Sequence, residues 1–158
     1  MATRDQLYAK FGITAEAAQL FETVLGTIVL IAKGRNNDWF VDADPVAAAT
    51  ILKRVERSTL GGILNGLLSK EHQLSSEDLV MFKKGLDTRN KLFHGFYERH
   101  NFSIQTEAGR DEMIADLEEI HTELFNCWQR AGEICDCLSD GLLSQEMIDE
   151  IVERGIGK

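Results

Sequence analysis

Apolar side chains recur at alternating intervals of four and three residues across the last third of the sequence. Because an α-helix has 3.6 residues per turn, this spacing places all of those side chains along one stripe of a helix. A stripe almost four heptads long predicts one long helix that packs against other helices. The positions are Met113, Leu117, Ile120, Leu124, Cys127, Ala131, Ile134 and Leu138.

Local signals predict the other helices. Thr14 can cap a mostly buried helix that ends at Gly34, and Pro45 favours the start of the next one. The segment SSED at residues 75–78 is typical of a helix N-terminus. The expected helices cover residues 14–34, 45–57, 60–70 and 76–98, and a short last helix is expected in SQEMIDEIVERG, residues 144–155.

No segment alternates apolar and polar residues as a half-buried strand does, and no linker or internal repeat interrupts the chain. We therefore expect an all-α protein, an up-and-down helical bundle of four main helices plus a short C-terminal helix. With 158 residues, the chain is expected to form a single domain over 1–158 and to bury a core without help from metals or disulfides.

Cysteine usage and hydropathy suggest a location. The three cysteines cannot all pair, and no signal-peptide pattern opens the sequence, so we expect a reducing, cytoplasmic environment. The longest apolar run, VLGTIVLIA at residues 24–32, is about half of the ~20 residues that a membrane span needs. A soluble protein with no membrane partner is therefore expected.

The net charge of −9 is unevenly distributed. Residues 1–108 carry 13 basic and 13 acidic side chains, whereas residues 109–158 carry 4 basic and 13 acidic ones. Within residues 83–100, five basic side chains stand against two acidic ones. An acidic protein can thus still present a locally basic cleft.

The helix expected over residues 76–98 carries polar side chains where its pattern calls for apolar ones. Burying an arginine or an amide without partners costs several kcal/mol, so such groups must meet another chain, a ligand or a partner in the fold. Asn90 and His94 are one turn apart, and the long side chain of Arg89 can reach the same place. The expected buried stripe runs through Leu79, Phe82, Leu86, position 89 or 90, Phe93, and Phe96 or Tyr97.

The hexapeptide RNKLFH, residues 89–94, resembles the Arg, polar, three variable residues, His motif of HEPN domains (higher eukaryotes and prokaryotes nucleotide-binding). The following GF and the upstream TLGGILNGLL are also similar to a bacterial branch of that family. Family members are helical bundles, usually dimeric, and many are metal-independent ribonucleases. The resemblance implies that Arg89 and His94 are functional, that Asn90 orients the site, and that two motifs face each other across a homodimer.

Such an enzyme would use the chemistry of RNA itself. The 2′-hydroxyl can attack the adjacent phosphate if a base removes its proton and an acid protonates the leaving 5′ oxygen. Histidine can serve in either role, and the planar fork of an arginine can hold the phosphate oxygens. Further contacts to RNA or phosphate are expected from Lys83, Lys84, Lys91, Arg99 and His100.

The resemblance also suggests a toxin or defence component, with an antitoxin or another regulatory protein as partner. Antitoxin-regulated members often carry a tyrosine two residues after the histidine as a nucleotidylation site. Here Phe96 occupies that position and Tyr97 follows, so this route of regulation is not expected.

Other interpretations of the motif remain open. The same cleft would suit a non-catalytic module that binds nucleotide, RNA or a partner protein. Alternatively, the three polar residues would form a structural network in a helical dimer. No cluster of Cys, His, Asp or Glu has metal-ligand spacing, so neither a metal nor another cofactor is expected.

Overall fold

The computed structural model describes residues 1–39, 42–67 and 74–140. In this part of the chain every regular element is a helix, which confirms the all-α prediction. The short helix expected over residues 144–155 lies outside the described residues. The elements are α1 (Arg4–Asn36), α2 (Pro45–Arg57), α3 (Leu60–Leu67), α4 (Ser76–His100), the 3-10 helix η1 (Asn101–Gln105) and α5 (Glu107–Ser139).

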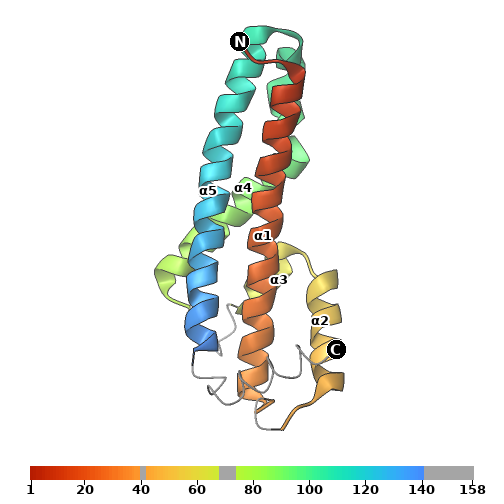
Figure 1. Ribbon diagram of the computed structural model, residues 1–158, viewed down its shortest axis with the longest axis vertical. Helices are drawn as coiled ribbons and strands as arrows, with labels where there is room; N and C mark the ends of the chain where they lie inside the picture. The colour runs from red at the N-terminus through yellow and green to blue at the C-terminus, as the bar shows by residue number, and fades with distance from the viewer. Residues whose placement is uncertain (40–41, 68–73, 141–158) are drawn as a thin grey trace, which may run out of the picture.

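Helices α1 and α5 run side by side in the same direction (Figure 1). Near their N-termini the backbone amide of Ala2 donates to Oδ1 of Asp111 at 2.7 Å. Farther along, the hydroxyl of Thr14 lies 3.4 Å from the carbonyl oxygen of Leu117. Residue numbers rise together on the two helices, so the pair is parallel although about 100 residues separate its partners.

Helix α4 runs in the opposite direction and packs against both α1 and α5. Asp78, near its start, bonds to Arg130 in the second half of α5, whereas Arg99, near its end, bonds to Asp116 in the first half. On the other side, the rings of Phe21 and Phe82 lie 5.6 Å apart between α1 and α4. The short helices α2 and α3 lie against α1 (Figure 1).

The apolar stripe predicted on α5 lies in the core. Its first six positions, from Met113 to Ala131, are buried, and Ile134 and Leu138 pack partly against the same cluster. The prediction of one long packed helix is therefore confirmed. The stripe meets buried side chains of the other helices: Leu7, Ala17, Ala18, Phe21, Leu25 and Ile28 of α1, Leu60, Ile63 and Leu64 of α3, and Phe82, Leu92 and Phe96 of α4.

The start of α1 differs from the expectation. Thr3 is the N-cap, with the reciprocal bonds to Gln6 that define a capping box. Thr14 lies inside the helix and donates to the carbonyl oxygen of Lys10 at 2.8 Å, a bond that a helical threonine makes readily. Leu7, fully buried, extends the apolar stripe about two turns before the expected start, so the longer helix buries more surface.

Helix α1 is also long and apolar enough to cross a membrane. An 18-residue window within it has a mean hydropathy of 1.5, and 39% of that window is buried inside the protein. A core helix meets the same criteria of length and composition. The unbroken apolar run at residues 24–32 is shorter than this 18-residue window, so run length alone does not identify the segment.

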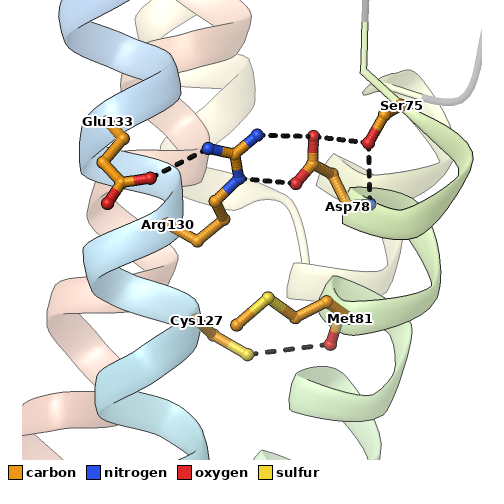
Figure 2. A network of polar contacts seen from close by, with 6 residues as sticks. All are labelled: Ser75, Asp78, Met81, Cys127, Arg130 and Glu133. Carbon is orange, nitrogen blue, oxygen red and sulfur yellow. Dashed lines mark hydrogen bonds and ion pairs between the residues drawn. The ribbon is translucent and has the colours of Figure 1, made fainter.

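A polar network joins the first turn of α4 to α5 (Figure 2). The guanidinium of Arg130 donates from Nε to Oδ1 of Asp78 at 2.7 Å and from Nη2 to Oδ2 at 3.2 Å. The hydroxyl of Ser75 donates to the same carboxylate at 2.7 Å and accepts from the amide of Asp78 at 3.1 Å. Chiefly because of the Arg130 bonds, the pKa of Asp78 is held below its ordinary value, although burial opposes this.

Removing a leucine of the α5 stripe should destabilise the protein more than removing a histidine from the surface of α4. We expect Leu117→Ala or Leu124→Ala to lower the free energy of unfolding by about 2 to 5 kcal/mol, through lost burial and a residual cavity. His94→Ala should cost less because its side chain is exposed. Urea unfolding of the three variants tests this ranking, and a His94→Ala variant that is the least stable would contradict it.

Acid should weaken the link between Asp78 and Arg130. Because the folded state lowers the pKa of Asp78, its contribution to stability is present above the unfolded pKa of about 3.9 and is lost as the pH falls through the lower folded value. Asp78→Asn should therefore be less stable than wild type at about pH 6, with a gap that narrows toward about pH 2. A gap that stays constant in urea unfolding across this range would refute the expected linkage.

Candidate functional site

The buried face of α4 agrees with the stripe expected from the sequence at Phe82 and Phe96 and lies about one residue away from it at the other positions. Asn90 is exposed and Phe93 is 39% exposed, so the expectation that these positions lie in the buried stripe is wrong. Arg89 is half-buried. The buried positions of α4 are Asp78, Phe82, Gly85, Thr88, Leu92 and Phe96.

Small residues explain the shift. A Cβ built on Gly85 would lie 2.7 Å from Sγ of Cys127 and 3.1 Å from Cε1 of Phe21, so a side chain there would force these neighbours to move. Gly85 thus leaves room for the thiol of Cys127 and the ring of Phe21 against the backbone of α4. Thr88 follows on the same face. The large apolar side chain of Leu86, about 100° around the helix, is the reason that the sequence pattern places the buried face there instead.

Arg89 faces α1. Its Nε donates to Oε1 of Glu22 at 2.5 Å, and its guanidinium carbon lies 5.0 Å from the centre of the Phe93 ring. Its Nη1 donates to Oδ1 of Asn90 at 3.2 Å. Both members of the ion pair are only partly exposed, at 25% for Arg89 and 28% for Glu22. The guanidinium is therefore held from three sides.

Asn90 and His94 border a shallow hollow of about 440 Å³ on the outward surface of α4. Lys91, Gly95, Arg99 and Asp87 complete its lining. Among the described residues no side chain hydrogen-bonds to His94. The hollow thus offers an accessible imidazole next to an amide and a lysine.

The bond from Arg89 determines which way the amide of Asn90 is turned. A guanidinium has donors only, so the atom of Asn90 that meets it must be the carbonyl oxygen. The NH₂ group of Asn90 is then left to donate elsewhere, next to His94. Asn90 therefore contacts Arg89 on one flank of α4 and shares the lining of the hollow with His94, whereas Arg89 itself is not among the lining residues.

The five basic or titratable residues expected to contact RNA or phosphate lie in different settings. Lys83 is exposed, and Lys91 borders the hollow. The amine of Lys84 lies 3.3 Å from Oε1 of Glu123, on the flank of α4 that faces α5. Arg99 borders the hollow, and His100, with 15% of its side chain exposed, lies on the bundle side. The structure therefore places Lys91 and Arg99 beside His94 and directs Lys84 and His100 toward α5.

Arg99 and His100 share a carboxylate on α5. Nη2 of Arg99 lies 2.5 Å and Nε2 of His100 lies 2.6 Å from Oδ2 of Asp116. Burial raises the pKa of Asp116, but the hydrogen bonds from these two residues outweigh it and hold that pKa below its ordinary value. The His100 ring also packs 4.8 Å from that of Phe96, so this group fixes the end of α4 to α5.

An aromatic surface continues the motif toward the N-terminus of α1. Phe11 packs 5.5 Å from the ring of Tyr97 and 5.7 Å from that of Phe96. Tyr97 is 42% exposed, and burial, with Tyr8 nearby, raises its pKa. Phe96, two residues after His94, is only 1% exposed and has no hydroxyl.

Other reactive groups lie away from the hollow. The thiol of Cys127 is buried and its pKa is raised to about 11, mainly by burial and also by the Glu123 carboxylate, so it is protonated near neutral pH. Within residues 1–39, 42–67 and 74–140, no three side chains of His, Cys, Asp or Glu gather as a metal site.

Glu22 is the site residue that the sequence argument missed. It is the only charged residue between positions 17 and 32, in the most apolar part of α1. A lone charge in such a segment was a usable signal that a partner lies nearby. Its partner is 67 positions away, and only the packing of α1 against α4 identifies it as Arg89.

Comparison with known proteins adds no relative to this picture. No family model, no curated protein and no solved structure matches the chain.

Proposed function

We propose that the protein is an HEPN-like, metal-independent endoribonuclease that acts as a cytoplasmic homodimer. The observation that carries the proposal is the link from Arg89 through Asn90 to the hollow with His94. In this proposal α1, α4 and α5, with α2 and α3 as the fourth member, correspond to the four-helix bundle of that family. The biological role would be that of a toxin or defence component, controlled by an antitoxin or another regulatory protein.

The proposed reaction is transfer within the RNA chain. His94 takes the proton of the 2′-hydroxyl or delivers one to the leaving 5′ oxygen, and its exposed imidazole suits either role. The bond between phosphorus and the 5′ oxygen breaks as that between phosphorus and the 2′ oxygen forms. Free N–H groups of Arg89 and Asn90 stabilise the negative charge on the phosphate oxygens.

The homodimer would supply a second copy of the motif histidine, which one chain lacks. One motif contributes one histidine, whereas the reaction needs both an acid and a base. Costly burial of the motif in a monomer does not favour a dimer, because Asn90 and His94 are exposed in the single chain. The support is instead that the hollow is open and that Phe93 and Tyr97 leave apolar surface beside it.

The ion pair with Glu22 favours a second candidate. A carboxylate 2.5 Å from Nε already neutralises Arg89, as in a network that only fixes helix packing. In that case the hollow would bind nucleotide, RNA or a partner protein without cutting, or α4 would serve only as a dimer interface. RNA cleavage by purified protein distinguishes these functions.

Purified protein should cut mixed RNAs in the presence of EDTA and leave 2′,3′-cyclic phosphate ends. A 2′-deoxy substitution at the cut site should block the reaction, because the 2′-hydroxyl is the nucleophile. His94→Ala should abolish cleavage. Arg89→Lys should lower it strongly, because an ammonium cannot reproduce the planar fork. Gel analysis with end-group mapping measures these effects.

Controls separate this activity from contamination. His121→Ala alters a histidine on α5, outside the hollow, and should cut like wild type. Cleavage that survives in His94→Ala, or that disappears with EDTA and returns with magnesium, would reject the proposed mechanism and indicate another nuclease.

Light scattering should give about twice the chain mass of 17.7 kDa at micromolar protein. Phe93→Glu should shift the protein toward monomer, because it would place a charge in the proposed interface. Phe102→Glu is the matched control, since Phe102 is 75% exposed on η1, beyond the C-terminal end of α4 and outside the lining of the hollow, and that variant should remain dimeric. A wild-type monomer would argue against both the dimer and the composite site.

A further inference from the structure

The orientation of the Arg89 side chain is determined by a contact with helix α1. An arginine side chain has four rotatable bonds, so its head group is poorly defined unless a partner holds it. Here Nε donates to Oε1 of Glu22 at 2.5 Å and the guanidinium stacks against Phe93. Glu22 supplies the only partner that Arg89 has on α1 among the described residues.

Glu22 is itself held on a rigid support. The preceding residue, Phe21, is fully buried and packs 5.6 Å from the ring of Phe82 on α4. Phe21 also lies where a side chain on Gly85 would collide with it, so the ring of Phe21 packs against the backbone of α4 one turn from the ion pair. The position of the carboxylate relative to α4 therefore follows from core packing.

The bonds that Arg89 makes leave part of its fork available. A guanidinium has five N–H donors. One is used by Glu22 and one by Asn90. Within the described residues three remain, on Nη1 and Nη2. Arg89 can thus bind a phosphate oxygen without releasing Glu22.

We propose that Glu22 is a positioning residue: it holds Arg89 by Nε so that Nη1 orients the Asn90 amide and the remaining N–H groups meet the phosphate. This inference rests on the ribonuclease function proposed above. The consequence is that the motif has a fourth member, contributed by α1 and separated from Arg89 by 67 positions.

If Glu22 positions Arg89, its removal should slow cleavage, whereas a purely electrostatic role predicts that cleavage stays as fast or becomes faster. Loss of a carboxylate near a phosphate site makes the local potential more positive, so RNA should bind as well or more tightly. If charge alone mattered, cleavage would also be as fast or faster. If Glu22 orients Arg89, kcat falls although binding does not weaken, because misplacement of a catalytic group costs rate.

The experiment compares Glu22→Ala, Glu22→Gln and a matched control, Glu123→Ala. Glu123 is 26% exposed, close to the 28% of Glu22, and pairs with Lys84 on the opposite flank of α4. We expect Glu22→Ala to lower kcat by about tenfold to a hundredfold, with KM unchanged or lower. Glu22→Gln should recover part of kcat, because its amide oxygen can still accept from Nε. Glu123→Ala should cut like wild type.

Nuclear magnetic resonance supplies a readout that needs no activity. In Glu22→Ala the Nε–H signal of Arg89 and the side-chain NH₂ signals of Asn90 should move, whereas in Glu123→Ala they should stay. If wild type cuts no RNA, the ribonuclease proposal fails, and these signals still decide whether Glu22 orients the motif. Unmoved Asn90 signals, an unchanged kcat, or a loss of kcat that matches a general loss of folded protein in thermal melts would each overturn the role of Glu22.

Discussion

The parallel pairing of α1 with α5 is the constraint on which the rest of the structure depends. Two helices about 100 residues apart in sequence bury their apolar stripes against each other and form one surface for α4. Because α4 lies against both, its two flanks meet different helices. The flank toward α1 carries Arg89, and the flank toward α5 carries Lys84 and Arg99. The surface opposite the core carries His94.

This arrangement determines which charged side chains of α4 form ion pairs with neighbouring helices. Arg89, Lys84 and Arg99 each meet a carboxylate on a neighbouring helix, so much of the local positive charge read from the sequence is already paired. In the described part of the chain Lys83 and Lys91 have no such partner. Asp87 and Glu98 are also exposed on α4 and offset these two lysines, so the outward surface of α4 is close to neutral. Any discrimination in favour of RNA would depend on the geometry of Arg89, Asn90 and His94 more than on attraction at long range.

The periodicity of the sequence was sufficient to predict the features of the fold that large apolar side chains determine. The α5 stripe, the all-helical class and the helix from Pro45 to Arg57 all follow from spacing and caps. Periodicity failed where a small residue or a partner distant in sequence determines the packing. Gly85 lies in the α4 seam because Phe21 and Cys127 leave no room for a side chain, and the Thr3 cap extends α1 beyond Thr14. Glu22 could be noticed as a lone charge, but its pairing with Arg89 is a property of three-dimensional packing.

The parallel pair also has a consequence for the order in which the chain becomes stable. Helix α1 is synthesised first, and the stripe of α5 that covers it is completed about 100 residues later, roughly 5 to 20 s at ordinary rates of translation. Until then the apolar face of α1 has only α2, α3 and part of α4 to cover it. Contacts between such distant segments raise the relative contact order, which slows folding compared with bundles built from sequential hairpins. The nascent chain is therefore expected to rely on chaperones more than its small size and helical content suggest.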